Sequence, residues 1–223
     1  MTHSIDKFEV IEARWQTASW SDYEKLRDND SIGHVQLFFN ENKLLVENMG
    51  GEGIDHAKVR ELFIMIFGFW YAQHPEVLLT SIGGCLLEKK GIQAAAPDLI
   101  LYVGGDIPIY REGERRYINL NCYRAPDLVG EVSDTTLASD MRQKGDLYAE
   151  LGIREYWVID IKGKRVFAFT MSESKTYVET EVSGVLDGLK IELLNQALER
   201  LSTSNVAAAA WFNQQLSNKE DKV

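Results

Sequence analysis

Three ionisable residues stand in segments of the sequence that are otherwise apolar. Asp98 precedes the run Leu99 to Val103, Glu131 interrupts the run Leu128 to Val132, and Lys144 falls on the apolar stripe of a predicted helix. Burying a charge is costly unless it is paired or bound to a metal. Two carboxylates and a lysine are the groups that divalent-metal hydrolysis of a phosphodiester needs. We therefore take these three residues as the candidate catalytic cluster.

Each of the three also has a plain structural interpretation when it is taken alone. Asp98 follows a proline and could be a strand-entry or turn residue. Glu131 could pair with an arginine, and Lys144 could pair with Asp140 four residues earlier or extend past the edge of the helix. Two carboxylates on neighbouring strands with a lysine on the following helix favour a functional cluster over three unrelated pairs.

A second Pro-Asp pair, Pro126-Asp127, competes for the role of the first carboxylate. Asp127 and Glu131 would share one face of the same strand, but they would lie about 13 Å apart at the usual rise per residue. That separation is too long for two ligands of one ion. We expect Asp127 to be a strand-start residue and Asp98 to approach Glu131 from an adjacent strand.

The elements that must position these residues follow from periodicity and caps. The pattern predicts a helix over Ser19 to Arg27, a hairpin of His34 to Phe39 and Leu44 to Met49, and a buried helix over Ile54 to Gln73. Short runs rich in β-branched and aromatic residues predict further strands at Val77 to Ser81, Ala96 to Val103, Tyr117 to Cys122, Leu128 to Ser133, Tyr156 to Ile161 and Val166 to Thr170.

One clear helix connects two of these strands. It runs from Leu137 to Leu151 and ends at Gly152, which predicts a strand, helix, strand crossover. Helices are also expected over Ile191 to Leu201 and Val206 to Gln215. The chain is therefore expected to be α/β, with an N-terminal arm at 1–18, a single domain at 19–202 and a C-terminal helical tail at 203–223.

Composition limits the class of protein. The 223 residues are 45% hydrophobic and 26% charged, as in an ordinary globular chain. No apolar run is long enough for a membrane span, and the N-terminus lacks a signal sequence, so we expect a cytoplasmic protein without membrane contact. Cys85 and Cys122 lie far apart without a nearby Cys or His cluster, which argues against a disulfide framework or a zinc site.

The charge balance restricts any nucleic-acid partner. The chain has 24 Lys and Arg against 34 Asp and Glu, a net charge of −10, and a uniformly acidic surface would repel DNA. Contact with DNA therefore needs local positive charge on one rim of the fold. The candidates are Arg115, Arg116, Lys162, Lys164 and Arg165, although such clusters are often only solvated faces.

The order and spacing of these motifs resemble a known family. The matching residues are Pro97-Asp98-Leu99-Ile100, Pro126-Asp127-Leu128-Val129-Gly130-Glu131-Val132-Ser133, Asp140, Lys144, Tyr148, Gly152 and Glu155-Tyr156-Trp157-Val158-Ile159-Asp160. They are similar to the bacterial restriction endonuclease family of the PD-(D/E)XK superfamily. The similarity extends from about Ser19 to Leu201 and includes the hairpin and His56.

The resemblance implies a restriction endonuclease-like fold, in which helices flank a mixed central sheet and the N-terminal hairpin is an extension. It implies that Asp98, Glu131 and the backbone carbonyl of Val132 hold Mg²⁺ or Mn²⁺ at one edge of the sheet. In the superfamily the lysine stands two residues after the second acid, where this chain has Ser133. The resemblance therefore assigns the lysine's role to Lys144.

Two further positions bear on the expected site. Similar sequences often carry an acid where this chain has Gln36, which argues against an extra carboxylate from the hairpin. His56 opens the long helix and is a secondary candidate, either as a ligand to phosphate or water or as a structural histidine bonded to the preceding glycine loop.

These observations support two functions of different class. The first is a metal-dependent endonuclease that hydrolyses DNA, expected to act as a homodimer because two-fold symmetry supplies a site for each strand. The second is a weakly active or inactive nuclease-like module for DNA binding or assembly, which Ser133, Gln36 and the acidic balance favour.

Overall fold

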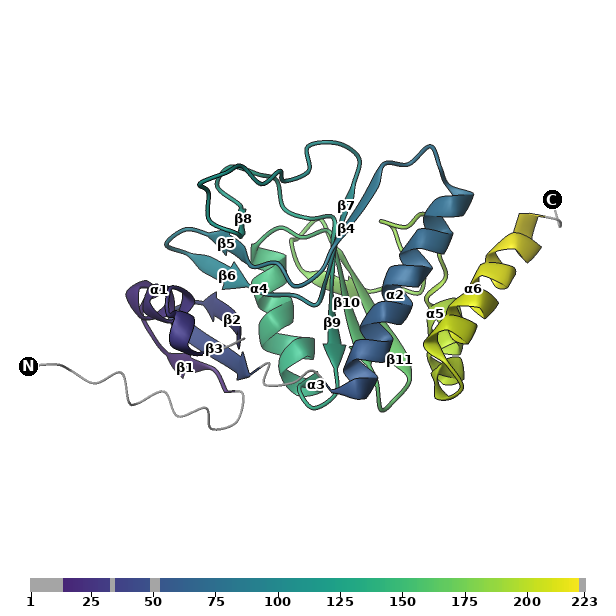
Figure 1. Ribbon diagram of the computed structural model, residues 1–223, viewed down its shortest axis with the longest axis horizontal. Coiled ribbons are helices and arrows are strands. Elements are labelled where there is room, and N and C mark those ends of the chain that lie inside the picture. The colour runs from purple at the N-terminus through teal and green to yellow at the C-terminus, as the bar shows by residue number, and fades with distance from the viewer. Residues whose placement is uncertain (1–13, 33–34, 49–52, 221–223) are drawn as a thin grey trace, which may run out of the picture.

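The computed structural model describes residues 14–32, 35–48 and 53–220, and its strands form two six-stranded sheets (Figure 1). The first sheet has the order β1 (Gln16–Thr17), β3 (Lys43–Asn48), β2 (Val35–Asn40), β6 (Gln93–Ala95), β5 (Leu87–Lys89) and β8 (Ile118–Asn119). The second has the order β12 (Tyr177–Glu179), β11 (Arg165–Met171), β10 (Glu155–Asp160), β9 (Leu128–Ser133), β7 (Leu99–Val103) and β4 (Leu79–Ile82).

The second sheet is the mixed central sheet of the fold, and β9 is its most buried strand. β9 pairs parallel with β10 and antiparallel with β7, and all six of its residues are buried. Leu128 and Val132 pack in the core beneath the long helix, whereas Val129 packs in the core on the opposite face. The alternation along β9 therefore separates the two faces of the sheet.

Helices cover both faces of the central sheet (Figure 1). On one face α2 (Ile54–Gln73) packs against α6 (Asn205–Glu220), with α5 (Ile191–Glu199) and the 3₁₀ turn Arg200–Ser202 beside them. On the other face lie α3 (Leu137–Ser139), a π-helical segment (Asp140–Lys144) and α4 (Gly145–Glu150), which form the crossover between β9 and β10. This arrangement confirms the fold predicted from the sequence.

The N-terminal hairpin belongs to a larger extension than the sequence predicts. Its strands β2 and β3 are joined by Glu41 and Asn42, whose φ values of 48° and 56° suit a tight two-residue turn. α1 (Trp20–Arg27), which begins after an N-cap at Ser19, and the short turn Asp30–Ile32 lie beside it. Further strands that include β6 and β5 complete the first sheet, so the extension is a sheet of its own.

Several predicted bounds are wrong for identifiable reasons. The strand predicted over Ala96 to Val103 begins at Leu99, because residues 96–98 connect β6 of the first sheet with β7 of the second. The strand predicted over Tyr117 to Cys122 is limited to β8. The three-residue strands β5 and β6 were not predicted because their polar residues, such as Glu88 and Gln93, hide the apolar pattern.

The ends of the chain differ in how much is described. Residues 1–13 of the predicted arm and the predicted strand ends His34 and Met49 lie outside the described residues. In the predicted tail, Ala208, Ala209 and Phe212 of α6 are buried in the same core as α2. Among the described helices, none has the length and apolar character that crossing a membrane would require.

Candidate active site

The ladder between β7 and β9 brings two of the predicted carboxylates together. Leu99 pairs with Gly130, and one further step along the antiparallel ladder sets Asp98 opposite Glu131. Opposed residues of such a pair point to the same face of the sheet. Asp98 extends the ladder with its side chain, because its Oδ2 accepts a 2.8 Å hydrogen bond from the backbone N–H of Val132. Asp98 and Glu131 are only 4% and 2% exposed.

Lys144 reaches this pair from the crossover helix. Its Nζ lies 3.2 Å from Glu131 Oε2, 3.0 Å from Asp140 Oδ1 and 2.9 Å from Glu47 Oε2. The Phe38 ring covers the ammonium at 4.1 Å from the ring centroid. The two sequence interpretations of Lys144 are therefore compatible, since it contacts the predicted acid Glu131 and also pairs with Asp140.

The helix that carries Lys144 is not the continuous α-helix that the sequence predicts. Asp140–Lys144 forms a π-helical turn between α3 and α4. The Tyr156 hydroxyl donates a 2.9 Å hydrogen bond to the Asp140 carbonyl, and an outside group inserted into the helical ladder is a known cause of such distortion. Single π turns inside helices are frequent at functional sites. Here the turn carries both Asp140 and Lys144 at its ends.

Glu131 is fixed on both of its oxygens. Lys144 donates to Oε2, and the hydroxyl of Tyr148 donates to Oε1. Burial raises the pKa of Glu131 well above its ordinary value; the charge of Lys144 lowers it, and the neighbouring carboxylates of Asp98 and Asp140 raise it further. Ionised Glu131 therefore costs free energy unless more positive charge is supplied.

Asp98 has the opposite tendency. Burial raises its pKa, but a 3.2 Å contact with His56 Nε2, the Val132 N–H and the charge of Lys144 together lower it below the ordinary value. Gln36 Nε2 donates to Oδ1 at 3.0 Å. Asp98 is thus held as a carboxylate at neutral pH. His56 touches the site through Asp98 and is about one-sixth exposed, at 16%.

The cluster carries more negative charge than its own cation balances. Glu47, Asp98, Glu131 and Asp140 gather around Lys144, and burial raises the pKa of Glu47 as well. Within the described part of the chain, Glu47 Oε1 is buried without a hydrogen-bond partner, and Asp140 Oδ1 has only its 3.0 Å ion contact with Lys144. A group of buried carboxylates of this kind must take up protons or a cation.

The donor set fits a hard divalent cation of the magnesium type. Mg²⁺ is commonly held by one or two carboxylates and completes its shell with water and phosphate oxygen. Over residues 14–32, 35–48 and 53–220 no three His, Cys, Asp or Glu side chains form a ready-made metal cage. The protein ligands would therefore be the two carboxylates of Asp98 and Glu131 with the Val132 carbonyl.

The hairpin supplies a carboxylate that the sequence argument missed. Gln36 argued against an acid from the hairpin, but the β2–β3 register pairs Gln36 directly with Glu47, and Glu47 contacts Lys144. The expectation of no hairpin carboxylate is wrong. The signal was present, because the tight turn at Glu41 and Asn42 fixes the register and so sets the two residues side by side.

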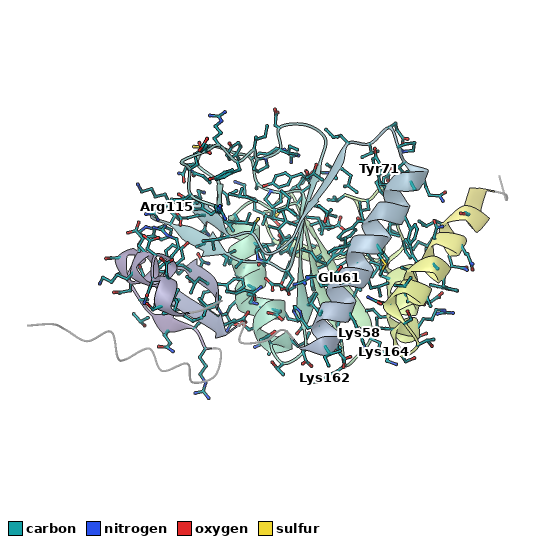
Figure 2. The ribbon with its side chains drawn as sticks, viewed as in Figure 1. Lys58, Glu61, Tyr71, Arg115, Lys162 and Lys164 are labelled. Carbon is teal, nitrogen blue, oxygen red and sulfur yellow. The ribbon has the colours of Figure 1, made fainter. Side chains whose placement is uncertain are left out.

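The predicted basic residues do not share one rim. Figure 2 shows Arg115 far from Lys162 and Lys164, which lie with Lys58 on the side where α2 begins. Arg115 and Arg116 belong to the segment between β7 and β8, which leaves β7 at the end opposite to Asp98. Lys162 and Lys164 lie in the β10–β11 turn and Arg165 begins β11, at the end where β9 finishes beside the site.

Most of these basic side chains also have acidic neighbours. Arg115 lies 2.8 Å from Asp28, Lys162 lies 3.3 Å from Asp134, and Arg165 lies 2.9 Å from Glu179. These are exposed pairs of the kind that contribute little to stability. They can therefore exchange a carboxylate for a phosphate at small cost.

The sequence of this chain matches a known protein family. The model of the Uma2 family, described as "Putative restriction endonuclease", matches residues 20–207. The chain belongs to the Uma2 family. This confirms the resemblance seen in the sequence. No curated protein matches the sequence significantly.

The fold of this Uma2 chain is also similar to a solved structure. That structure is described as "a putative nuclease belonging to DUF820 from Anabaena variabilis ATCC 29413". The superposition has a TM-score of 0.54 at 16% sequence identity, and it covers 81% of this chain and 98% of that one. The similarity establishes a shared fold over most of the Uma2 domain.

Proposed function

We propose that this Uma2 chain is a metal-dependent endonuclease that hydrolyses phosphodiester bonds in DNA. One observation carries the proposal: Asp98 and Glu131 lie on one face of neighbouring strands, and Lys144 contacts Glu131 from the crossover helix. The cluster combines hard oxygen ligands with a cation that can face a phosphate. A surplus of buried carboxylate over lysine supports metal binding in particular.

Asp98, Glu131 and the Val132 carbonyl would hold Mg²⁺ or Mn²⁺. Such an ion, when bound, polarises the scissile phosphate and lowers the pKa of a coordinated water. Asp98 is suited to be the permanent ligand because its lowered pKa keeps it ionised. Glu131, whose raised pKa disfavours the ionised form, would gain most from the added positive charge.

Lys144 and His56 would act around these ligands. The Lys144 ammonium would offset, through its charge, the negative charge that gathers on the scissile phosphate. His56 would orient Asp98 through its 3.2 Å contact and, on the first turn of α2, would lie beside the entering phosphate or water. Tyr148 would hold the second oxygen of Glu131 in place.

DNA would approach from the end of the central sheet where β9 finishes. Lys162, Lys164 and Arg165 lie at that end and would contact backbone phosphates, which are recognised without regard to base sequence. Arg115 and Arg116 lie at the other end, so they would serve a separate DNA contact. A two-fold homodimer would supply a second site for the opposite strand.

A cleavage assay tests the function directly. Plasmid and single-stranded DNA are incubated with the wild type, Asp98→Ala and Lys144→Ala in Mg²⁺, Mn²⁺ or EDTA, with circular dichroism to verify folding. We expect metal-dependent cleavage by the wild type and its loss in both variants. Asp127→Asn is the matched control and should cleave. DNA binding by a wild type that cleaves with neither metal would instead support the nuclease-like binding module.

A further inference from the structure

The Ser133 hydroxyl is a buried polar group close to the candidate active site. Ser133 ends β9 and is 1% exposed, and none of the described residues forms a hydrogen bond with its Oγ. Ser183, which is equally buried at 2%, has two partners, because its Oγ accepts from the N–H groups of Val185 and Leu186. An unsatisfied buried group costs about 1–3 kcal/mol, which a ligand can offset.

Ser133 faces the candidate active site. Val129, Glu131 and Ser133 alternate along β9 and therefore share one face. Val129 packs in the same core as Tyr148, whereas Val132 packs on the α2 side. Ser133 thus lies on the side of Glu131 and the π-helical turn, two residues or about 7 Å along the strand from Glu131.

The neighbouring strand, β10, does not provide a hydrogen-bond partner for this hydroxyl, and it continues directly into the basic β10–β11 turn. Asp160 is the β10 partner of Ser133, but its Oδ1 accepts a 2.9 Å hydrogen bond from Gly163 N–H. Ile161 N–H donates to the Ser133 carbonyl at 3.1 Å, and Lys162 follows directly in the chain. Ser133 therefore lies between the paired carboxylates and the turn proposed to hold DNA phosphates.

Lys144 is poorly placed to supply the direct hydrogen bond to a phosphate. Its ammonium donates to Glu47 and Glu131, contacts Asp140 and is covered by Phe38. It can supply charge from this position, but its hydrogen bonds are largely engaged. A neutral hydroxyl can donate to phosphate oxygen without adding to the crowded charges.

We propose that Ser133 is a further catalytic residue, whose hydroxyl donates a hydrogen bond to a non-bridging oxygen of the scissile phosphate. This inference rests on the proposed nuclease function. In the reaction the water oxygen bonds to phosphorus, the bond from phosphorus to the leaving oxygen breaks, and the leaving oxygen takes up a proton. Ser133 stays covalently unchanged and stabilises the charge on the phosphate oxygen.

Single-turnover cleavage of Ser133→Ala tests this role. With saturating duplex DNA and Mg²⁺, the rate should fall about 100-fold, as for loss of one oxyanion donor. The Kd for the same duplex, measured by fluorescence anisotropy in Ca²⁺, should stay within about twofold because backbone contacts dominate affinity. The Tm should be unchanged or higher, because the substitution removes an unsatisfied hydroxyl. Ser133→Thr, which keeps the hydroxyl, should restore most of the rate.

Ser183→Ala is the matched control, since it removes an equally buried hydroxyl that is bonded to backbone. It should lower the Tm and leave the cleavage rate of the folded protein unchanged. A wild-type rate in Ser133→Ala would overturn the inference while the nuclease function stands. A parallel loss of Tm and rate in Ser133→Ala would overturn it as well, by showing a structural role. A wild type inactive in Mg²⁺ and Mn²⁺ would overturn both proposals.

Discussion

The chain contains two Pro-Asp pairs, and their environments are opposite in charge. Asp98 begins the approach to β7 and Asp127 the approach to β9, and because these strands are antiparallel the two aspartates lie at opposite ends of one ladder. Asp127 accepts from Val103 N–H at 2.7 Å and pairs with Arg124 at 2.7 Å and Arg154 at 3.3 Å. Both aspartates are buried, at 4% and 6% exposure.

The difference shows that the local charge balance, and not the dipeptide, distinguishes a candidate metal site from a structural anchor. Asp127 is one carboxylate between two guanidinium groups, so it has no surplus charge for a metal to neutralise. Asp98 belongs to a group of four carboxylates that share Lys144 and one histidine. A cation would stabilise the second group and be repelled by the arginines of the first.

Exchanging the two aspartates for asparagine should separate activity from structure most strongly. Asp98→Asn should lower the DNA cleavage rate by at least about 1000-fold, or about 4 kcal/mol of transition-state stabilisation. Asp127→Asn should keep the wild-type rate and lose stability, because a hydrogen-bonded buried charge is removed from between two arginines. Rates under single turnover and Tm values check both. Equal loss of cleavage in the two variants would remove the distinction.

Lys144→Met should cause the largest loss of stability. It leaves three carboxylates without their cation, and breaking a buried pair costs about 3–5 kcal/mol, or roughly 6–20 °C in Tm for a chain of this size. Arg154→Met at Asp127 is the control and should cost under about 1 kcal/mol, because Arg154 is 65% exposed.

The loss of stability caused by Lys144→Met should depend on pH. Burial raises the pKa of Glu47 and of Glu131, and groups with raised folded pKa values lose stability as pH rises through the range above their ordinary values. Removing the ammonium raises these pKa values further, so the deficit should shrink as pH falls from 8 to 5. Thermal unfolding across this range measures it, and a deficit independent of pH would be inconsistent with carboxylate repulsion.

Glu131→Gln should have a smaller and opposite effect on stability. Because the pKa of Glu131 is raised, its ionisation costs stability above its ordinary range, and glutamine removes that cost. Relative to the wild type, the variant should gain about 1 kcal/mol at pH 7.5, roughly 2–4 °C in Tm, and nothing near pH 4.5. Cleavage should be lost. If the stability of Glu131→Gln relative to the wild type instead fell as pH rises, the predicted direction of the effect would be wrong.

The sequence predicts the apolar elements of the fold well and the connections less well. The bounds of α2 and β9 follow from their strongly apolar patterns and match the structure. The π turn at Asp140 does not follow from the sequence pattern, because the Tyr156 hydroxyl that bonds to the Asp140 carbonyl comes from the following strand, β10. The first sheet is equally hidden, since its three-residue strands β5 and β6 contain buried polar residues.

The same limit applies to the site. Asp98, Glu131 and Lys144 are visible in the sequence because each charge interrupts an apolar run. Glu47 is missed because its contact with Lys144 joins residues that lie far apart in the chain. Its position beside Gln36 depends on the register of the hairpin. The separation of Arg115 from Lys162 also depends on the topology, because the segment between β7 and β8 and the β10–β11 turn leave the central sheet at opposite ends.

The central claim, that the surplus of carboxylates around Asp98 and Glu131 binds a divalent cation, is tested most directly by thermal unfolding at pH 7.5 during titration with Mg²⁺ and Mn²⁺. At ten times the Kd the expected stabilisation is about 1.4 kcal/mol, or roughly 3–6 °C in Tm. The wild type and Asp127→Asn should show the shift, and Asp98→Asn should not. A wild-type Tm that is indifferent to both metals, or an equal shift in Asp98→Asn, would contradict the claim.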